Sequence, residues 1–152
     1  MPATLTVESP LGLLALRAEG NQLKSLNWVD APAEENTTDA LREAATQLRA
    51  YFDGRLTGFD LPLAPEGTEH QQAVWSAMLR IPYGTLITYG EIAEELNSSA
   101  RAVGMACGRN PIPVIIPCHR VIASGGGMGG YSGRGGLETK RALLLLEGAM
   151  LA

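Results

Sequence analysis

Between residues 4 and 29, apolar and polar side chains alternate with the two-residue period of strands that bury one face. The pattern covers three segments, which are Thr4–Glu8, Gly12–Arg17 and Gln22–Val29. Ser9-Pro10 and Glu19-Gly20-Asn21 separate them, and these residue types favour turns. The N-terminal part is therefore predicted to form a small antiparallel sheet.

The spacing of apolar residues becomes helical after a polar, proline-containing stretch at 31–38, which predicts a loop. Over Asp39–Phe52, apolar residues recur every three or four positions, as in a helix with one buried face. Asp39 is the expected N-cap, because its carboxylate can accept a backbone N–H, and Gly54 is the expected stop. Residues 54–67 carry glycine, proline and charge, and they predict a linker.

The rest of the chain is predicted to be mostly helical. Helical spacing extends over four segments, which are Gln71–Arg80, Thr88–Leu96, Ser99–Cys107 and Leu137–Glu147. The middle two are short and closely spaced, as in a helix-turn-helix. Val114–Ile116 predicts a strand-like run, and residues 124–136 predict a Gly-rich loop. The fold class is therefore α+β, with an N-terminal α/β domain and linker at 1–67 and a helical domain at 68–152.

Composition narrows the class of protein. A chain of 152 residues with 45% hydrophobic residues has enough apolar side chains for a packed core. No apolar run approaches the roughly 20 residues that cross a bilayer, and Met1–Thr4 lacks the features that begin a secretory signal. We expect a cytoplasmic protein without a membrane partner.

Charge is distributed unevenly along the chain. The net charge of −4 is unfavourable for a nucleic-acid partner. Residues 1–79 hold 5 Lys and Arg against 11 Asp and Glu, a net charge of −6, whereas residues 80–152 hold 7 against 5, a net charge of +2. The basic part favours an interaction with polyanions, but two ordinary solvated surfaces explain the asymmetry equally well.

The chain has two cysteines, Cys107 and Cys118, and two histidines, His70 and His119. Without a CxxC pair these residues predict neither a disulfide framework nor a metal site. Cys118 and His119 are adjacent, and an imidazole can take the proton that turns a thiol into a nucleophilic thiolate. In an extended chain, however, neighbouring side chains point to opposite faces. The dipeptide alone therefore favours an inert core cysteine.

Short motifs at specific spacings around Cys118 change this interpretation. They are Thr88-Tyr89-Gly90-Glu91, Arg101-Ala102-Val103-Gly104, Asn110-Pro111, Pro117-Cys118-His119-Arg120-Val121, Gly130-Tyr131-Ser132-Gly133 and Leu146-Glu147-Gly148. This arrangement resembles the O6-alkylguanine-DNA alkyltransferase family, also called the methylated-DNA–protein-cysteine methyltransferases. The resemblance covers roughly residues 71–148, about half of the chain.

The resemblance implies a role in catalysis for five residues. Cys118 would accept the alkyl group, and His119 would act as the base through a water molecule. Glu147 would hold His119 in the required tautomer, as carboxylates do in other nucleophile–histidine systems. Tyr89 would hydrogen-bond the departing guanine, and Asn110 would brace the turn before Cys118.

The resemblance also implies how DNA is bound. The damaged base must leave the stack, and Arg101 would fill the space that it vacates. The small residues Ala100, Ala102 and Gly104 would let the helix enter the minor groove. Tyr89 and Ser132 would also contact the DNA. The predicted substrate pocket comprises Val121, Tyr131, Ser132 and Lys140.

The implied activity is direct reversal of O6-alkylguanine in double-stranded DNA by a monomer without a cofactor, with O4-alkylthymine as a second candidate lesion. Alkyl transfer to sulfur leaves a thioether, which has no carbonyl for water to attack, so each chain would react once. Three features depart from the usual family pattern: His70 replaces an aromatic residue, the link Asn97-Ser98-Ser99 is short, and Arg134-Gly135 lengthens the loop. None of them is in the reactive set.

Three other functions are compatible with parts of the sequence. A sensor of alkylated DNA on the same fold would bind without transfer, but such relatives replace the cysteine, which is present here as Cys118. A helix-turn-helix transcription regulator would need a dimerisation element, and no obvious one follows the motif. A Cys–His hydrolase would need a nucleophile elbow or a protease motif, and the sequence has neither.

Overall fold

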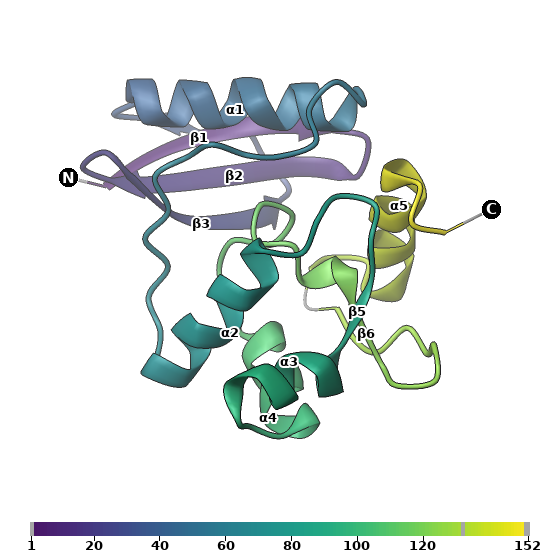
Figure 1. The fold of residues 1–152 in the computed structure, drawn as a ribbon. Coiled ribbons are helices and arrows are strands. Elements are labelled where there is room, and N and C mark those ends of the chain that lie inside the picture. The colour runs from purple at the N-terminus through teal and green to yellow at the C-terminus, as the bar shows by residue number, and fades with distance from the viewer. Residues whose placement is uncertain (1, 132, 151–152) are drawn as a thin grey trace. The chain divides into compact units, whose positions relative to one another are not determined.

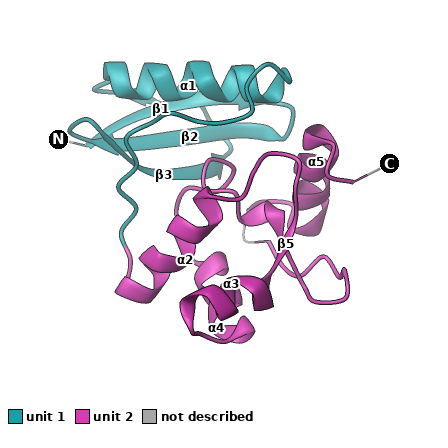
Figure 2. Ribbon diagram, in the orientation of Figure 1, with its two compact units in different colours: residues 1–66 teal, residues 67–152 magenta. Residues whose placement is uncertain are grey.

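The computed structural model describes residues 2–131 and 133–150 (Figure 1). The chain divides into two compact units, residues 1–66 and residues 67–152 (Figure 2). The first contains an antiparallel sheet with a helix and the second is mainly helical, so the predicted α+β class is confirmed. Among the described residues, no helix is both long and apolar enough to cross a membrane.

The sheet of the first unit has the strand order β3-β2-β1-β4, and every neighbouring pair is antiparallel. Its strands are β1 (Pro2–Ser9), β2 (Gly12–Glu19), β3 (Gln22–Val29) and β4 (Glu34–Glu35). The alternating pattern sets the register, which places Leu16 opposite Leu5 on one side and Leu26 on the other. Residues 31–38 were expected to form only a loop, but β4 lies within them and pairs with β1.

Helix α1 (Asp39–Phe52) lies along one face of this sheet and contacts β1 and β2 (Figure 1). Its buried residues are Leu41, Ala44, Ala45, Leu48 and Tyr51, the stripe that helical spacing predicts. The expected N-cap, however, was wrong by one residue. Thr38 has extended backbone angles and its hydroxyl accepts the Leu41 N–H, whereas Asp39 is already in the first turn and pairs with Arg42.

The second unit brings three helices together before the segment that carries Cys118. They are α2 (Glu69–Leu79), α3 (Tyr89–Leu96) and α4 (Ala100–Gly108). The hydroxyls of Thr68, Thr88 and Ser99 cap them by accepting the N–H three residues later, so two residues expected inside helices lie just before them.

The link between α3 and α4 is short and ordered. Asn97 ends α3 in the left-handed conformation, with φ 55°, and the Ser98 N–H donates to the Ala93 carbonyl at 2.8 Å. His70 Nε2 and Ser98 Oγ are 2.9 Å apart, so α2 also contacts the link through its first turn. Helices α3 and α4 pack on each other, in the order and with the spacing of a helix-turn-helix.

The chain then returns through a turn rather than a strand. Val114–Ile116 was expected to be strand-like, but Val114 has φ 74° and the Ile116 N–H donates to the Ile112 carbonyl at 2.9 Å. The strand interaction lies elsewhere: β5 (Ile87–Thr88) pairs in parallel with β6 (Val121–Ile122). These pieces are too short to show a sequence period, and their pairing depends on distant parts of the chain. Helix α5 (Leu137–Glu147) completes the unit.

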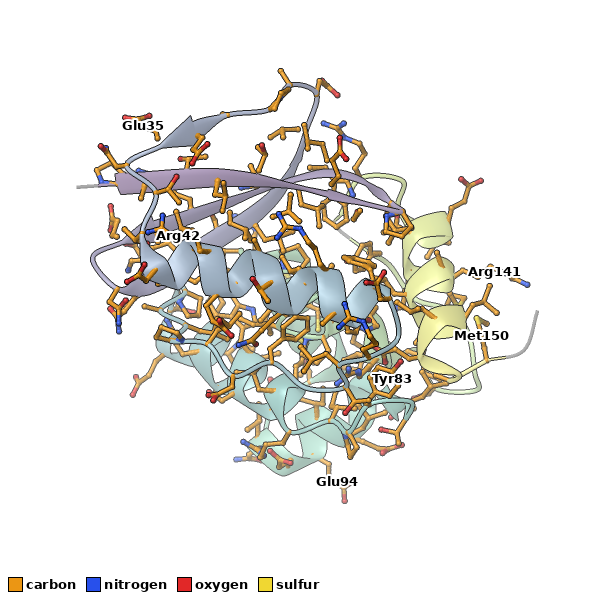
Figure 3. All side chains as sticks on the ribbon, turned by 90° about the horizontal axis from the view of Figure 1, so that it is seen from above. Glu35, Arg42, Tyr83, Glu94, Arg141 and Met150 are labelled. Carbon is orange, nitrogen blue, oxygen red and sulfur yellow. The ribbon has the colours of Figure 1, made fainter. Side chains whose placement is uncertain are left out.

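The position of the α1 cap can be tested with two neighbouring variants. Thr38→Ala removes the hydroxyl that accepts the Leu41 N–H, and it should lower the free energy of unfolding by about 1 kcal/mol. Asp39→Ala removes only an exposed ion pair with Arg42 (labelled in Figure 3), and it should change stability by less than about 0.5 kcal/mol. Urea unfolding followed by circular dichroism measures both. A larger loss for Asp39→Ala would contradict the cap.

Candidate active site

A cavity of about 420 Å³ opens in the second unit, and Cys118 lies in its wall. The other lining residues are Tyr89, Gly104, Cys107, Gly108, Gly130 and Tyr131. They come from the start of α3, from one side of α4 and from the Gly-rich loop. The predicted site residues Cys118, Tyr89, Gly104 and Tyr131 are thus brought together around one space.

Asn110 shapes the turn that carries the chain from α4 back to the cavity. Its side-chain Nδ2 donates to the Ile116 carbonyl at 2.9 Å, and its Oδ1 accepts the Ile112 N–H at 2.9 Å. The side chain is buried, so both of its polar ends find partners that water cannot supply. An amide is well suited to this position because it both donates and accepts.

Cys118, His119 and Arg120 form a single 3₁₀ turn, closed by a hydrogen bond from the Arg120 N–H to the Pro117 carbonyl at 3.0 Å. The expectation of opposite-facing neighbours in an extended chain was therefore wrong. With about three residues per turn, successive side chains are about 120° apart rather than 180°. Cys118 can face the cavity while His119 points into the protein beside it.

Behind Cys118, three charged or titratable side chains form a buried network. Glu147, at the end of α5, accepts a hydrogen bond from His119 Nε2 at 2.7 Å. It also accepts two from Arg120: Nε donates to Oε1 at 2.8 Å, and Nη2 donates to Oε2 at 2.9 Å. The side chains of His119 and Glu147 are fully buried, and Arg120 is 7% exposed.

Arg120 links this network to the rest of the unit. Its Nη1 donates to the Ile81 carbonyl at 2.7 Å, and its guanidinium lies 5.7 Å from the centroid of the Tyr83 ring. The Tyr83 hydroxyl in turn donates to the Leu146 carbonyl at 3.3 Å. Arg120 therefore holds the carboxylate of Glu147 by a planar, bidentate contact, and its other contacts hold the guanidinium in position.

The network determines which nitrogen of His119 carries a proton. Because Arg120 donates to both oxygens of Glu147, the carboxylate is ionised and can only accept, so His119 Nε2 must be the donor. Burial lowers the pKa of His119 below its usual 6.5, although the hydrogen bond that His119 donates to Glu147 acts in the opposite direction. The ring is thus neutral near pH 7, with its lone pair on Nδ1, which has no hydrogen-bond partner among the described residues.

The thiol of Cys118 is protonated in the resting protein. Burial raises its pKa to about 11, although a hydrogen bond from the Asn110 side chain and the charge of Lys140 lower it in part. The second cavity-lining thiol, Cys107, also has a pKa raised by burial, to about 12, and its Sγ lies 3.5 Å from Met78 Sδ. A nucleophile at Cys118 therefore needs a base.

Lys140 holds the Gly-rich loop against the site. The residue is fully buried, and its ammonium donates to the carbonyls of Val121 at 2.6 Å and Gly130 at 3.1 Å, and also to that of Met128. Burial lowers the pKa of Lys140, while the nearby cysteines oppose that shift. Lys140 and Val121 thus lie beside the cavity rather than in its lining.

Tyr89 begins α3 and contacts the same loop. A Cβ atom on Gly129 would be 2.6 Å from the Tyr89 hydroxyl oxygen, so only glycine allows this approach. Burial raises the pKa of Tyr89 above 10.0, and burial raises that of Tyr131 further. Both phenols keep their protons at neutral pH and can act as donors.

Four of the predicted DNA-binding residues lie on α4, and of these only Gly104 lines the cavity; Tyr89, at the start of α3, lines it as well. Ala100 and Arg101 are exposed in the first turn, and Ala102 is half-buried. Ser132, predicted for both DNA contact and the substrate pocket, lies outside the described residues. Within the described ranges, no three His, Cys, Asp or Glu side chains are close enough to hold a metal ion.

Sequence reasoning missed Arg120 and Cys107. Arg120 is a cation inside an otherwise apolar stretch, and a charge in such a stretch signals a buried ion pair. Cys107 carried no such signal, because a cysteine in a helix of small residues is usually a packing residue.

Family models match both parts of the chain. Residues 4–65 match the ribonuclease-like domain of 6-O-methylguanine DNA methyltransferase, and residues 69–149 match its DNA-binding domain. A methylated-DNA–protein-cysteine methyltransferase from Methanosarcina acetivorans is 46% identical over 151 residues, which cover 93% of this chain and 96% of the relative. One from Mycobacterium tuberculosis is 47% identical over 150 residues, covering 93% and 90%.

Solved structures agree. The O6-methylguanine methyltransferase of M. tuberculosis superposes with a TM-score of 0.85 at 43% identity, covering 100% of this chain and 96% of that one. A structure of the OGT protein of M. tuberculosis in complex with DNA has a TM-score of 0.84 at 46% identity, covering 95% and 91%. The fold and the cysteine site thus define a cysteine-dependent methyltransferase class. The chain belongs to the 6-O-methylguanine DNA methyltransferase family.

The contribution of the buried network to the stability of the fold can be measured by replacing its cation, Arg120. Arg120→Leu leaves the Glu147 carboxylate paired only with His119, and it should lower the free energy of unfolding by about 3–5 kcal/mol. Arg120→Lys keeps the charge but loses the bidentate contact, so its free energy of unfolding should lie between those of Arg120→Leu and the wild type.

The matched control is Arg42→Leu, which removes an exposed ion pair and should change stability by less than about 1 kcal/mol. Chemical denaturation compares the three variants with the wild type. A loss for Arg120→Leu no larger than that of the control would mean that the network does not stabilise the fold.

Proposed function

We propose that this protein repairs double-stranded DNA by transferring an alkyl group from O6 of guanine to the sulfur of Cys118, once per chain and as a monomer. The observation that carries the proposal is the position of Cys118. Its thiol lines the cavity, while a neutral, oriented imidazole lies next to it in the chain. Transfer of an alkyl group to a cysteine needs both an accessible thiol and a base beside it, and Cys118 and His119 would supply them.

His119 supplies the base. Its Nδ1 lone pair faces away from Glu147, and one water molecule would carry the proton from the Cys118 thiol to it. The imidazolium that forms is stabilised by the ionised Glu147, which does not itself take the proton. Lys140 adds a positive charge near the developing thiolate, as its effect on the Cys118 pKa indicates.

The transfer step is a displacement at carbon. The sulfur of Cys118 forms a bond to the alkyl carbon, the bond between that carbon and O6 breaks, and the guanine takes the electron pair. The departing base needs a proton or a hydrogen bond to hold this charge. Tyr89 lines the cavity and remains protonated because burial raises its pKa, so its hydroxyl can donate to the base.

The product explains the single turnover. A thioether at Cys118 has no acyl carbon for water, and the thiol of Cys107 in the same cavity is itself protonated, with a pKa raised by burial to about 12. A sensor without transfer chemistry is not favoured, because Cys118 lines the cavity and a neutral imidazole follows it in the chain, which supports transfer.

DNA would reach the cavity through α4. A base inside a duplex is not accessible to a cavity of about 420 Å³ with Cys118 in its wall, so the nucleotide must rotate out of the stack. Arg101 is exposed at the start of α4, three residues before Gly104 and seven before Gly108, and both glycines line the cavity. This exposed position supports the proposal that Arg101 occupies the gap in the duplex and contacts phosphate.

The first test is intact-protein mass after incubation with a duplex that contains O6-methylguanine. We expect a gain of one methyl group, located on Cys118 by peptide mapping, with no further gain on longer incubation. Cys118→Ser should gain none, and Cys107→Ser should still gain one. A methyl group on another residue, or repeated turnover, would contradict the proposal.

The pKa directions predict the pH dependence. His119 has a pKa below 6.5 and Cys118 a pKa of about 11, so the neutral pair persists across the range between them. The wild-type transfer rate should therefore be level from about pH 7 to about pH 9. In His119→Gln the side chain can still donate to Glu147, but the Cys118 thiol must ionise without a base. The transfer rate of this variant should therefore be lower than the wild-type rate near pH 7 and should rise about tenfold per pH unit.

Transfer rates measured by mass spectrometry at constant ionic strength give both profiles. A level profile for His119→Gln would show that another group takes the proton. A steep rise for the wild type would show that His119 does not act as the base.

The role of Arg101 separates base extrusion from chemistry. Arg101→Ala should slow transfer from lesion duplex by roughly a hundredfold, because it removes a stacking contact worth about 1–3 kcal/mol together with a phosphate contact. Transfer from the free base O6-methylguanine should be unaffected. Equal losses with the two substrates would instead point to damage within the cavity.

A further inference from the structure

Helix α4 carries a large apolar side chain that the described protein leaves uncovered. Met105 is 63% exposed, more than any other large hydrophobic residue among the described ones. The others range from Leu145 at 37% to Leu137 at 49%. Methionine is flexible and apolar, and an exposed one on a functional helix is a frequent feature of binding surfaces.

The phase of α4 places Met105 on the side that carries Arg101. The two are four residues apart, so they are neighbours on one face of the helix. The opposite face is buried through Val103, Ala106 and Cys107. Met105 is therefore directed outward rather than into the core.

The cavity opens next to the same face. Gly104 and Gly108 both line it, and Met105 lies between them in the sequence, about one turn after Arg101. The two glycines have no side chain to hold DNA away from the helix. Met105 directly follows Gly104, so a long exposed side chain stands beside the cavity-lining part of α4.

Charge alone gives α4 little affinity for DNA. Its exposed cations are Arg101 and, just after its end, Arg109, while the whole chain has a net charge of −4. A protein with few phosphate contacts gains less from counterion release, so apolar contacts must contribute more of its binding. Apolar side chains, methionine included, serve as wedges between base steps in proteins that bind the minor groove.

We propose that Met105 is a further DNA-contacting residue of α4, an apolar wedge that enters the minor groove beside Arg101 and keeps it open where the nucleotide leaves the stack. This inference rests on the proposed function, because it assumes that α4 lies in the groove. It assigns Met105 a part in delivering the base and none in the transfer step.

The test compares rates of methyl transfer from a lesion duplex and from free O6-methylguanine over a series of salt concentrations. Met105→Ala should react with the duplex about tenfold more slowly, because it loses the burial of most of one apolar side chain. Its rate with the free base should match that of the wild type. Met105→Leu, which keeps the apolar volume, should recover most of the duplex rate.

Salt dependence separates the wedge from a phosphate contact. The slope of log rate against log salt should be the same for Met105→Ala and the wild type, whereas Arg101→Ala should reduce it by about one. Leu79→Ala, which shortens another exposed apolar residue outside the cavity lining, is the matched control and should leave both rates unchanged.

Three results would overturn the inference. In the first, Met105→Ala reacts with the duplex at the wild-type rate. In the second, its transfer rate falls equally with duplex and free base, which would indicate a structural effect. Failure of the wild type to accept a methyl group from either substrate would remove the proposed function together with the wedge. A duplex-specific loss that Met105→Leu restores would support it.

Discussion

The carboxylate of Glu147 is enclosed in the second unit, where an unpaired charge would be strongly destabilising. It is tolerated because Arg120 donates to both of its oxygens and His119 donates to one of them. These contacts join the end of α5 to the 3₁₀ turn that contains Cys118, and Arg120 extends them to Ile81 after α2. The position of the reactive turn thus depends on one buried ion pair.

The same ion pair sets the chemistry of the site. An ionised Glu147 requires a donor at His119 Nε2, and burial lowers the pKa of the ring, so a neutral base is available next to Cys118. Burial also raises the pKa of Cys118 to about 11, which keeps the thiol unreactive toward general electrophiles in the resting protein. Under the proposed function, transfer to Cys118 therefore requires both a substrate in the cavity and a proton path to His119.

Much of the fold follows from local pattern, whereas the site depends on distant contacts. The strands of residues 2–29 and the helix over Asp39–Phe52 were predictable because a two-residue or a helical period repeats over enough positions. Val114–Ile116 was misjudged because three apolar β-branched residues fit a strand, while the positive φ of Val114 is imposed by the turn that Asn110 closes. The β5–β6 pair and the Arg120–Glu147 contact join residues far apart in sequence, so the local spacing of apolar residues does not predict them.

The candidate site residues could be proposed from the sequence only through the motifs around Cys118. Geometry adds what those motifs do not contain: Cys107 and Gly108 in the cavity wall, Lys140 as the anchor of the loop, and Arg120 as the partner of Glu147. It also separates the residues by place, since Tyr89 and Cys118 line the cavity while Arg101 lies outside it on α4. Under the proposed function, the residues on α4 would bind DNA and those in the cavity would react with the extruded base.

The most direct test of this account is the protonation state of His119, read from the ring nitrogen shifts in a ¹⁵N NMR spectrum near pH 7. The chain has only one other histidine, His70, so His70→Gln assigns the signals. The account predicts a neutral ring with a proton on Nε2 and a lone pair on Nδ1. An imidazolium with protons on both nitrogens, or a proton on Nδ1 alone, would contradict it.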